Sequence, residues 1–152
     1  MIRVLFVCLG NICRSPTAEA IFRHRVGLAG REKEIDIDSA GTIAAHQGNP
    51  ADARMRRHAA LRGYDLTSIS RKVTRTDFIE FTHIVAMDRQ NLADLEAMAP
   101  QDATTTISLF LTADPEAPVQ EVPDPYYGGA EGFETVLDLI ESASDHFLES
   151  LS

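Results

Sequence analysis

Two residues near the amino terminus, Cys8 and Arg14, have the types and the spacing of a phosphoryl-transfer site. A thiolate is a strong nucleophile, and a guanidinium forms two parallel hydrogen bonds with the oxygens of a phosphoryl group. The intervening residues let the chain curl around a tetrahedral anion with its backbone N–H groups pointing inward. We expect Cys8 to be the nucleophile and Arg14 to bind phosphate. The other candidate phosphate-binding residues are Leu9, Gly10, Asn11, Ile12 and Cys13.

A helix that is predicted to follow this loop strengthens the same site. Pro16 suits the first turn of a helix, and the free N–H groups and positive dipole end of a helix amino terminus attract anions. The same field, together with the nearby arginine, stabilises a thiolate at Cys8. Gly10 and Asn11 tolerate a left-handed backbone. Ser15 is expected to hydrogen-bond the Cys8 sulfur when that sulfur leaves the phosphoryl group.

Cleavage of a phosphate ester also needs a proton donor, because the departing oxygen would otherwise leave as an anion. Asp124 lies between Pro123 and Pro125, whose fixed backbone angles hold a carboxyl at modest entropic cost. Protonated Asp124 would donate to the leaving oxygen and, once ionised, would activate the water of the second step. Tyr126 and Tyr127 would offer apolar walls to an aromatic leaving group.

Short apolar runs alternate with helical patterns along the chain, which is typical of an α/β fold with a parallel sheet. We predict one domain over residues 1–152 in three layers: a four-stranded parallel sheet in the order 2-1-3-4, helices on both faces, and the phosphate-binding loop after strand 1. The run at 2–7 is apolar on both faces and should be a central strand. The other expected strands are 35–40, 83–87 and 106–110, and the expected helices are 16 to 27 or 30, 53–62, 74–81, 88–98 and 132–151.

Charge is distributed unevenly along the sequence. The chain has 14 Lys and Arg residues against 23 Asp and Glu residues, which gives a formal net charge of −9. Residues 1–90 contain all 14 basic residues and 10 of the acidic ones, while residues 91–152 contain the other 13 acidic residues. A nucleic acid is therefore not an expected partner, and an anion site is expected in the first part of the chain.

Cysteine use and hydropathy indicate a cytoplasmic protein. Two cysteines five positions apart cannot staple a fold, so a reducing compartment is expected. No apolar segment approaches the ~20 residues of a membrane span, and we interpret the chain as complete and soluble, without a membrane partner. The five histidines show no metal-ligand spacing, so we expect no metal. Four arginines of the second helix are predicted to form a solvated face that balances the acidic carboxyl-terminal part, in preference to a docking patch: Arg54, Arg56, Arg57 and Arg62.

Taken together, these motifs resemble those of the low-molecular-weight protein tyrosine phosphatases, and the resemblance covers nearly the whole chain. It is carried by C-L-G-N-I-C-R-S at 8–15, D-S-A-G-T at 38–42, D-F at 77–78, A-M-D at 86–88 and D-P-Y-Y at 124–127. The family implies a metal-free and cofactor-free enzyme that hydrolyses phosphotyrosine in proteins through a phosphocysteine and releases inorganic phosphate. Cys8 would be its nucleophile, Arg14 its phosphate ligand and Asp124 its general acid; we expect a monomer.

The resemblance also assigns supporting roles and exposes departures. Ser39 would buttress Asn11, Asp88 would order the loop, and Cys13 would pair reversibly with Cys8 under oxidants. Family members often have an aromatic cleft residue where this chain has Ala45, so Ile43 or Tyr126 would have to fill that wall. Many members also have a histidine shortly before the residue matching Arg71, where this chain has Ser68.

Three alternative functions follow from the same residues. Arsenate reduction on this fold needs further thiols, and the chain has none after Cys13. Removal of phosphate from arginine is found in family members with Thr at the position of Ile12, and the bulkier Ile12 favours an aryl ester. The third alternative is a phosphate-binding or redox-sensing module without turnover, but binding alone would not require a proton donor such as Asp124.

Overall fold

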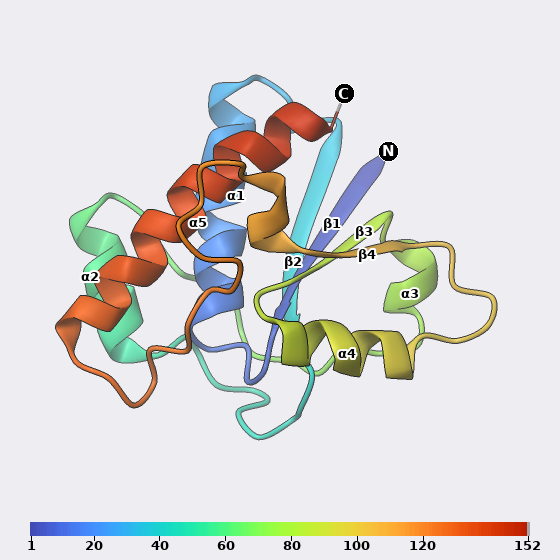
Figure 1. The fold of residues 1–152 in the computed structure, drawn as a ribbon, viewed down its shortest axis with the longest axis horizontal. Helices are drawn as coiled ribbons and strands as arrows, with labels where there is room; N and C mark the ends of the chain where they lie inside the picture. The colour runs from blue at the N-terminus through green and yellow to red at the C-terminus, as the bar shows by residue number, and fades with distance from the viewer. Residues whose placement is uncertain (152) are drawn as a thin grey trace.

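A computed structural model describes residues 1–151 of the chain as alternating strands and helices (Figure 1). The strands are β1 (Ile2–Cys8), β2 (Ile35–Gly41), β3 (His83–Ala86) and β4 (Thr106–Leu109). The helices are α1 (Arg14–Leu28), α2 (Ala53–Leu61), α3 (Asp77–Glu80), α4 (Arg89–Met98), the 3-10 helix η1 (Phe110–Ala113) and α5 (Ala130–Ser150). Over residues 1–151, no helix combines the length and the apolar character needed to cross a membrane.

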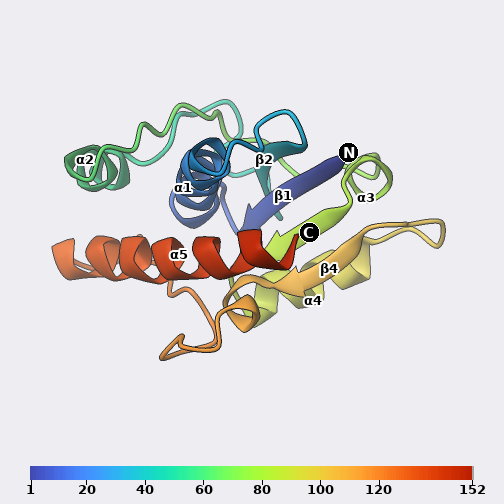
Figure 2. The same cartoon turned by 90° about the horizontal axis from the view of Figure 1, so that it is seen from above.

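The four strands form a single parallel sheet in the order β2-β1-β3-β4, which confirms the predicted topology and the central place of β1. Alternate residues of β1 face two separate cores. Val4 and Phe6 pack in the larger core with α1 and α5, where the Phe6 ring meets Phe22 edge-on at 5.4 Å. Leu5 and Val7 pack in the smaller core with residues of α3 and α4. Helices therefore cover both faces, with α1, α2 and α5 together on one of them (Figure 2).

The predicted helix at 74–81 is wrong in length, because only Asp77–Glu80 is α-helical. The N–H group of Thr74 is bound by the Asp77 carboxylate at 2.8 Å, so the segment begins as a side-chain turn. The N–H groups that follow bond three residues back, as Phe78 does to Arg75 at 3.2 Å. These tight turns take the place of the first turns of an α-helix. The other predicted elements are found with boundaries shifted by one or two residues.

The parallel register brings the ends of three strands to one edge of the sheet. Val7 of β1 pairs with Ala40 of β2 and with Ala86 of β3, so the residues after each strand lie close together. Cys8 ends β1, and Asp88 follows β3 after one residue. The carboxyl ends of parallel strands are where ligands bind in such folds.

Gly41 ends β2 at a point where two backbone segments nearly touch. A Cβ atom there would lie 2.7 Å from the carbonyl oxygen of Leu9 and 3.2 Å from the backbone nitrogen of Asn11. Neither neighbour is the end of a flexible side chain, so neither gives way without moving the loop after β1. The glycine therefore lets β2 support that loop by direct backbone contact.

We expect Gly41→Ala to lower the free energy of unfolding by about 1–3 kcal/mol, because it overpacks this contact. Gly27→Ala is the matched control, because its Cβ would meet no atom within 4 Å. Alanine at this exposed position of α1 should stabilise the protein by up to about 1 kcal/mol. Urea unfolding of the two variants measures both effects. Equal stability of Gly41→Ala and the wild type would contradict the prediction.

Candidate active site

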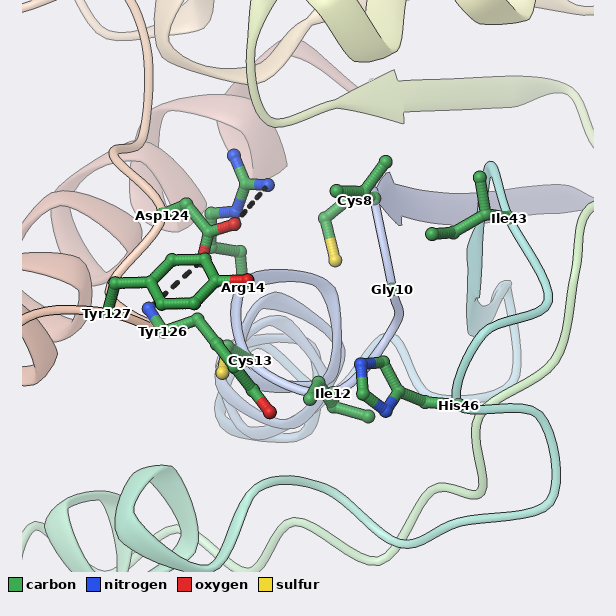
Figure 3. A pocket seen from close by; sticks show the side chains of 11 residues that line it. Cys8, Gly10, Ile12, Cys13, Arg14, Ile43, His46, Asp124, Tyr126 and Tyr127 are labelled. Carbon is green, nitrogen blue, oxygen red and sulfur yellow. Dashed lines mark hydrogen bonds and ion pairs between the residues drawn. The ribbon is translucent and has the colours of Figure 1, made fainter.

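A cavity of about 220 Å³ opens at the end of β1 and is lined by all three residues that were predicted to be catalytic (Figure 3). Cys8 is the last residue of β1 and Arg14 is the first residue of α1, so both belong to the expected strand-loop-helix junction. Asp124 reaches the cavity from the segment between η1 and α5. The other lining residues are Leu9, Gly10, Ile12, Cys13, Ile43, His46, Tyr126 and Tyr127.

Asn11 shapes the loop between β1 and α1 from behind. Its φ of 57° is left-handed, a conformation that asparagine adopts more readily than most residues. Its buried side-chain amide donates to Ser15 Oγ at 2.8 Å and to Ser39 Oγ at 3.0 Å, and its Oδ1 accepts from the backbone N–H of Arg71 at 3.1 Å. Asn11 and Ser39 are thus in contact, as the resemblance implies. Both side chains support the loop and neither lines the cavity.

A buried carboxylate gives these hydrogen bonds a direction. Glu19 Oε1 lies 2.5 Å from Ser39 Oγ, and an ionised carboxylate only accepts. Ser39 must therefore donate to Glu19 and accept from Asn11. Ser15 Oγ also accepts from Asn11, so the hydroxyl hydrogen of Ser15 is available for another acceptor. Cys8 Sγ lies 3.1 Å away and the carbonyl oxygen of Ala40 3.4 Å away, so Cys8 is the nearer acceptor. The network therefore presents a hydrogen-bond donor to a Cys8 thiolate.

Arg14 is held as a buried cation at the cavity wall. Its side chain is only 3% exposed, and its Nη1 donates to Asp88 Oδ2 at 2.6 Å and to the carbonyl oxygen of Val122 at 3.1 Å. Burial alone would lower the pKa of Arg14, but the charges of Cys8, Asp88 and Asp124 outweigh burial and raise it. The guanidinium is therefore charged and fixed in orientation. Asp88 also accepts the N–H of Asn91 at 2.7 Å, so it begins α4 as well.

Asp124 faces the guanidinium from the solvent side of the cavity. Its Oδ2 lies 3.7 Å from Arg14 Nη2, its Oδ1 accepts the N–H of Tyr126 at 3.1 Å, and its side chain is 41% exposed. The segment that carries it is anchored to the sheet, because the N–H of Val122 bonds the carbonyl oxygen of Met87 at 2.9 Å. A carboxyl group in this position can exchange protons with solvent and with a group bound at Arg14.

The side walls of the cavity differ from the predicted ones at one position. Ile43, Tyr126 and Tyr127 line the cavity as expected, but Ala45 is exposed and is not among the lining residues. His46 takes that place, 6.0 Å from the Tyr126 ring (Figure 3). Its ring packs against the loop backbone so closely that a Cβ on Gly10 would lie 2.9 Å from His46 Cδ2. The sequence did not predict His46 in the cavity wall, because the histidines were weighed only for metal-ligand spacing, which they lack.

The arginines of α2, together with Arg62 at its carboxyl-terminal cap, do not form one solvated face. Arg62 pairs with three acidic residues of α5, as the charge pattern predicts: Glu134, Asp138 and Glu141. Arg54, by contrast, donates to the carbonyl oxygen of Tyr126 at 3.0 Å and so contacts the segment that carries Asp124. The prediction is wrong for Arg54, because α2 lies close to that segment and the sequence gives no sign of this proximity.

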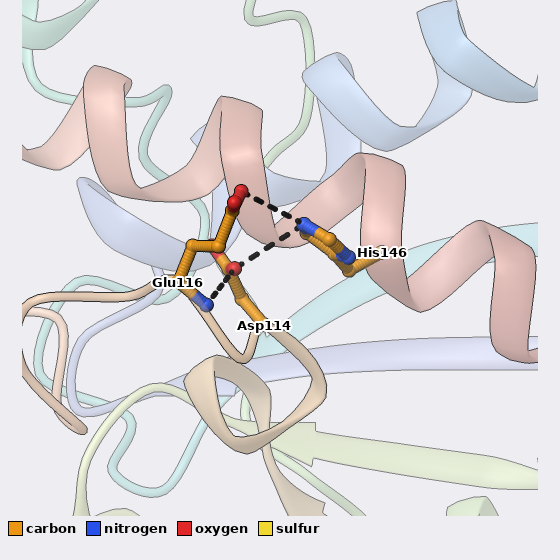
Figure 4. A group of neighbouring side chains, drawn as sticks. All are labelled: Asp114, Glu116 and His146. Carbon is orange, nitrogen blue, oxygen red and sulfur yellow. Dashed lines mark hydrogen bonds and ion pairs between the residues drawn. The ribbon is translucent and has the colours of Figure 1, made fainter.

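One group of side chains in residues 1–151 has a composition that a metal ion could use, and it lies outside the cavity (Figure 4). His146 of α5 lies 3.3 Å from Asp114 and 3.8 Å from Glu116. Asp114 also accepts the hydroxyl of Ser142 at 2.6 Å and the N–H of Glu116 at 2.9 Å. The group thus joins the segment after η1 to α5. The sequence spacing of the histidines did not reveal it, because its two carboxylates come from another part of the chain.

A parallel α/β fold with a thiol, a buried guanidinium and a solvent-facing carboxyl around one cavity has the composition of a cysteine-dependent phosphatase. Comparisons with known proteins agree. Residues 3–152 match the family model described as low molecular weight phosphotyrosine protein phosphatase. A protein of that name from Schizosaccharomyces pombe is 42% identical over 152 residues, which cover 99% of this chain and 97% of that protein.

Solved structures give the same result. A protein tyrosine phosphatase from Entamoeba histolytica, solved with Hepes in its active site, superposes with a TM-score of 0.96 at 41% identity and covers 99% of this chain and 97% of its own. The Drosophila arginine phosphatase superposes with a TM-score of 0.94 at 32% identity and covers 99% and 98%. The chain therefore belongs to the low-molecular-weight protein tyrosine phosphatase family.

We expect the two cysteines to differ sharply in reactivity at neutral pH. Burial and the charge of Asp52 raise the pKa of Cys13 to about 12, so Cys13 stays a neutral thiol far above neutrality, and a thiol is a poor nucleophile. Iodoacetamide should alkylate Cys8 and leave Cys13 unmodified in the folded protein. Peptide mass spectrometry measures both sites, with denatured protein as the control in which both react. Comparable rates at the two sites before denaturation would contradict the prediction.

Proposed function

We propose that this protein hydrolyses phosphotyrosine in proteins, with Cys8 as nucleophile, Arg14 as phosphate ligand and Asp124 as general acid. The observation that carries the proposal is the meeting of these three side chains in one cavity, although 110 positions separate Arg14 from Asp124. Family membership supports the reaction type, and the proposed substrates agree with the names of the relatives.

The loop and the helix amino terminus would bind the phosphoryl dianion. Arg14 Nη1 is occupied by Asp88 and Val122, so the rest of the guanidinium fork would bind two phosphoryl oxygens. The N–H groups of residues 9–14 and the dipole of α1 would supply the other donors. Since these donors are fixed before the substrate arrives, they stabilise the charge of the transition state without reorganisation.

The first step would transfer the phosphoryl group to Cys8. The thiolate forms an S–P bond while the P–O bond to the tyrosine ring breaks, and protonated Asp124 gives its proton to the departing phenolate oxygen. The second step would use ionised Asp124 to take a proton from water. The hydroxide equivalent forms a new P–O bond as the S–P bond breaks, the electron pair returns to Cys8, and inorganic phosphate is released. Ser15 would stabilise the returning thiolate through its hydrogen bond.

The walls of the cavity fit an aromatic substrate. Tyr126 and Tyr127 have their rings 4.9 Å apart and nearly perpendicular, and Tyr127 is 93% exposed at the mouth. With Ile43 on the opposite side, these rings would enclose a phenyl ring attached to the phosphate (Figure 3). The cytoplasmic location and the monomeric state remain predictions from the sequence, as does reversible pairing of the free thiols of Cys8 and Cys13.

We expect p-nitrophenyl phosphate hydrolysis at mildly acidic pH, without added metal, to disappear in Cys8→Ser. Asp124→Ala should lower kcat/KM by about 100- to 10,000-fold for esters with poor leaving groups, because the departing oxygen loses its proton donor. Steady-state kinetics of both variants and the wild type test this. If the wild-type protein binds phosphate tightly but does not turn over the ester, the proposed phosphatase activity is overturned and a phosphate-binding module is favoured.

Because this chain is similar to the Drosophila arginine phosphatase, phosphoarginine is the alternative substrate to test. Ile12 lines the cavity, and its branched apolar side chain suits an aryl ring better than a guanidinium. We therefore expect the wild type to prefer a phosphotyrosine peptide over a matched phosphoarginine peptide. Ile12→Thr should narrow that preference by about tenfold or more, the usual effect of one altered pocket group. Release of inorganic phosphate from both peptides measures the ratio, and a wild-type preference for phosphoarginine would contradict the assignment.

A further inference from the structure

Arg54 lies in the first turn of α2 and is held there by the residue that caps the helix. Its Nε and Nη2 donate to the two oxygens of Asp52 at 3.2 and 3.0 Å. Asp52 also accepts the backbone N–H groups of Arg54 at 2.8 Å and Met55 at 3.2 Å. Fork-shaped contacts of this kind fix the plane of a guanidinium. The side chain of Arg54 is 39% exposed, so its charge is not deeply desolvated.

The same Nη2 has a second hydrogen, and this hydrogen contacts the segment that carries Asp124. Nη2 donates to the carbonyl oxygen of Tyr126 at 3.0 Å. The guanidinium carbon lies 5.4 Å from the centre of the Tyr126 ring and 5.0 Å from the centre of the Phe133 ring, the latter on α5. Arg54 therefore holds Tyr126 by both its backbone and its ring.

The same arginine is tied to the nucleophile loop through Asp52. The backbone N–H of Asp52 donates to the carbonyl oxygen of Ile12 at 2.8 Å, and Ile12 lies between Cys8 and Arg14. A continuous path of hydrogen bonds thus runs from Ile12 through Asp52 and Arg54 to Tyr126. Tyr126 follows Asp124 by two residues and its N–H binds the Asp124 carboxylate.

We propose that Arg54 is a positioning residue that sets the place of the Asp124 carboxyl relative to Cys8. The proposal rests on the proposed function, in which Asp124 is the proton donor. Residues 122–126 form the segment that carries Asp124, here called the acid segment. Val122 fixes one end of it to Met87 and Arg14, and Arg54 fixes the other end at Tyr126. Without the second anchor, Asp124 would be free to swing away from the leaving oxygen, and proton transfer depends steeply on that distance.

Two substrates separate this role from general damage to the site. Phenyl phosphate releases a strongly basic phenolate that needs a proton, whereas 2,4-dinitrophenyl phosphate releases a phenolate that leaves without one. We expect Arg54→Met to lower kcat/KM for phenyl phosphate about 10- to 100-fold and to leave kcat/KM for the dinitrophenyl ester within about threefold of the wild type. Arg54→Lys, which keeps the charge but loses the fork, should fall between.

The controls use the same helix and the same acid. Arg57→Met changes an exposed arginine of α2 and should match the wild type on both esters. In an Asp124→Ala background, Arg54→Met should cause no further loss of kcat/KM for phenyl phosphate, because both changes remove the same function, proton donation to the leaving oxygen. Equal losses on the two esters, or an additional loss without Asp124, would overturn the proposal and leave Arg54 a purely structural residue.

A measurement independent of turnover keeps the two proposals distinguishable. Amide hydrogen exchange of residues 122–128, followed by mass spectrometry, should accelerate in Arg54→Met and stay at the wild-type rate in Arg57→Met. If the wild type hydrolyses neither ester, the proposed function fails, and exchange alone decides on Arg54. Unchanged exchange at 122–128 in Arg54→Met would overturn its positioning role whether or not the protein has phosphatase activity.

Discussion

The buried guanidinium of Arg14 is the constraint on which the site depends. A charge that is almost wholly removed from water is tolerated only when partners meet it at fixed places. Asp88 supplies the opposite charge from the turn after β3, and Val122 supplies a carbonyl oxygen from the segment before Asp124. The order and register of the sheet therefore matter for the site. Asp88 lies beside Arg14 because β1 and β3 are paired in parallel, with Val7 opposite Ala86.

A second constraint acts behind Cys8, where polar groups are buried and each must find a partner. Glu19 can only accept hydrogen bonds, and from this one fact the donor and acceptor roles of Ser39, Asn11 and Ser15 follow in turn. The hydrogen that remains at the end of the network is directed at Cys8. The Cys8 sulfur therefore has its hydrogen-bond donor because of a carboxylate with which it makes no hydrogen bond.

The sequence was sufficient for the fold, because apolar periodicity is a local signal. It was also sufficient for the choice of Cys8, Arg14 and Asp124, because each of them stands in an informative local pattern. It was insufficient where one element acts on another. The helix at 74–81 was shortened by the Asp77 side chain, and Glu19 gained its role only from Ser39 on another element. Two further contacts could not be predicted for the same reason: His46 lines the cavity in place of Ala45, and Arg54 reaches Tyr126. No spacing along the chain encodes which loops face each other.

The fixed ends of the acid segment have a consequence for how proteins of this shape can diverge. Between the buried Val122 and the carbonyl of Tyr126 only Pro123, Asp124 and Pro125 intervene, and both ends are bound to other parts of the fold. An insertion or deletion inside this interval would shift the carboxyl out of reach, so its length is frozen. An exposed stretch outside this interval, such as 118–119, carries no such restriction and is where additions to the chain can accumulate.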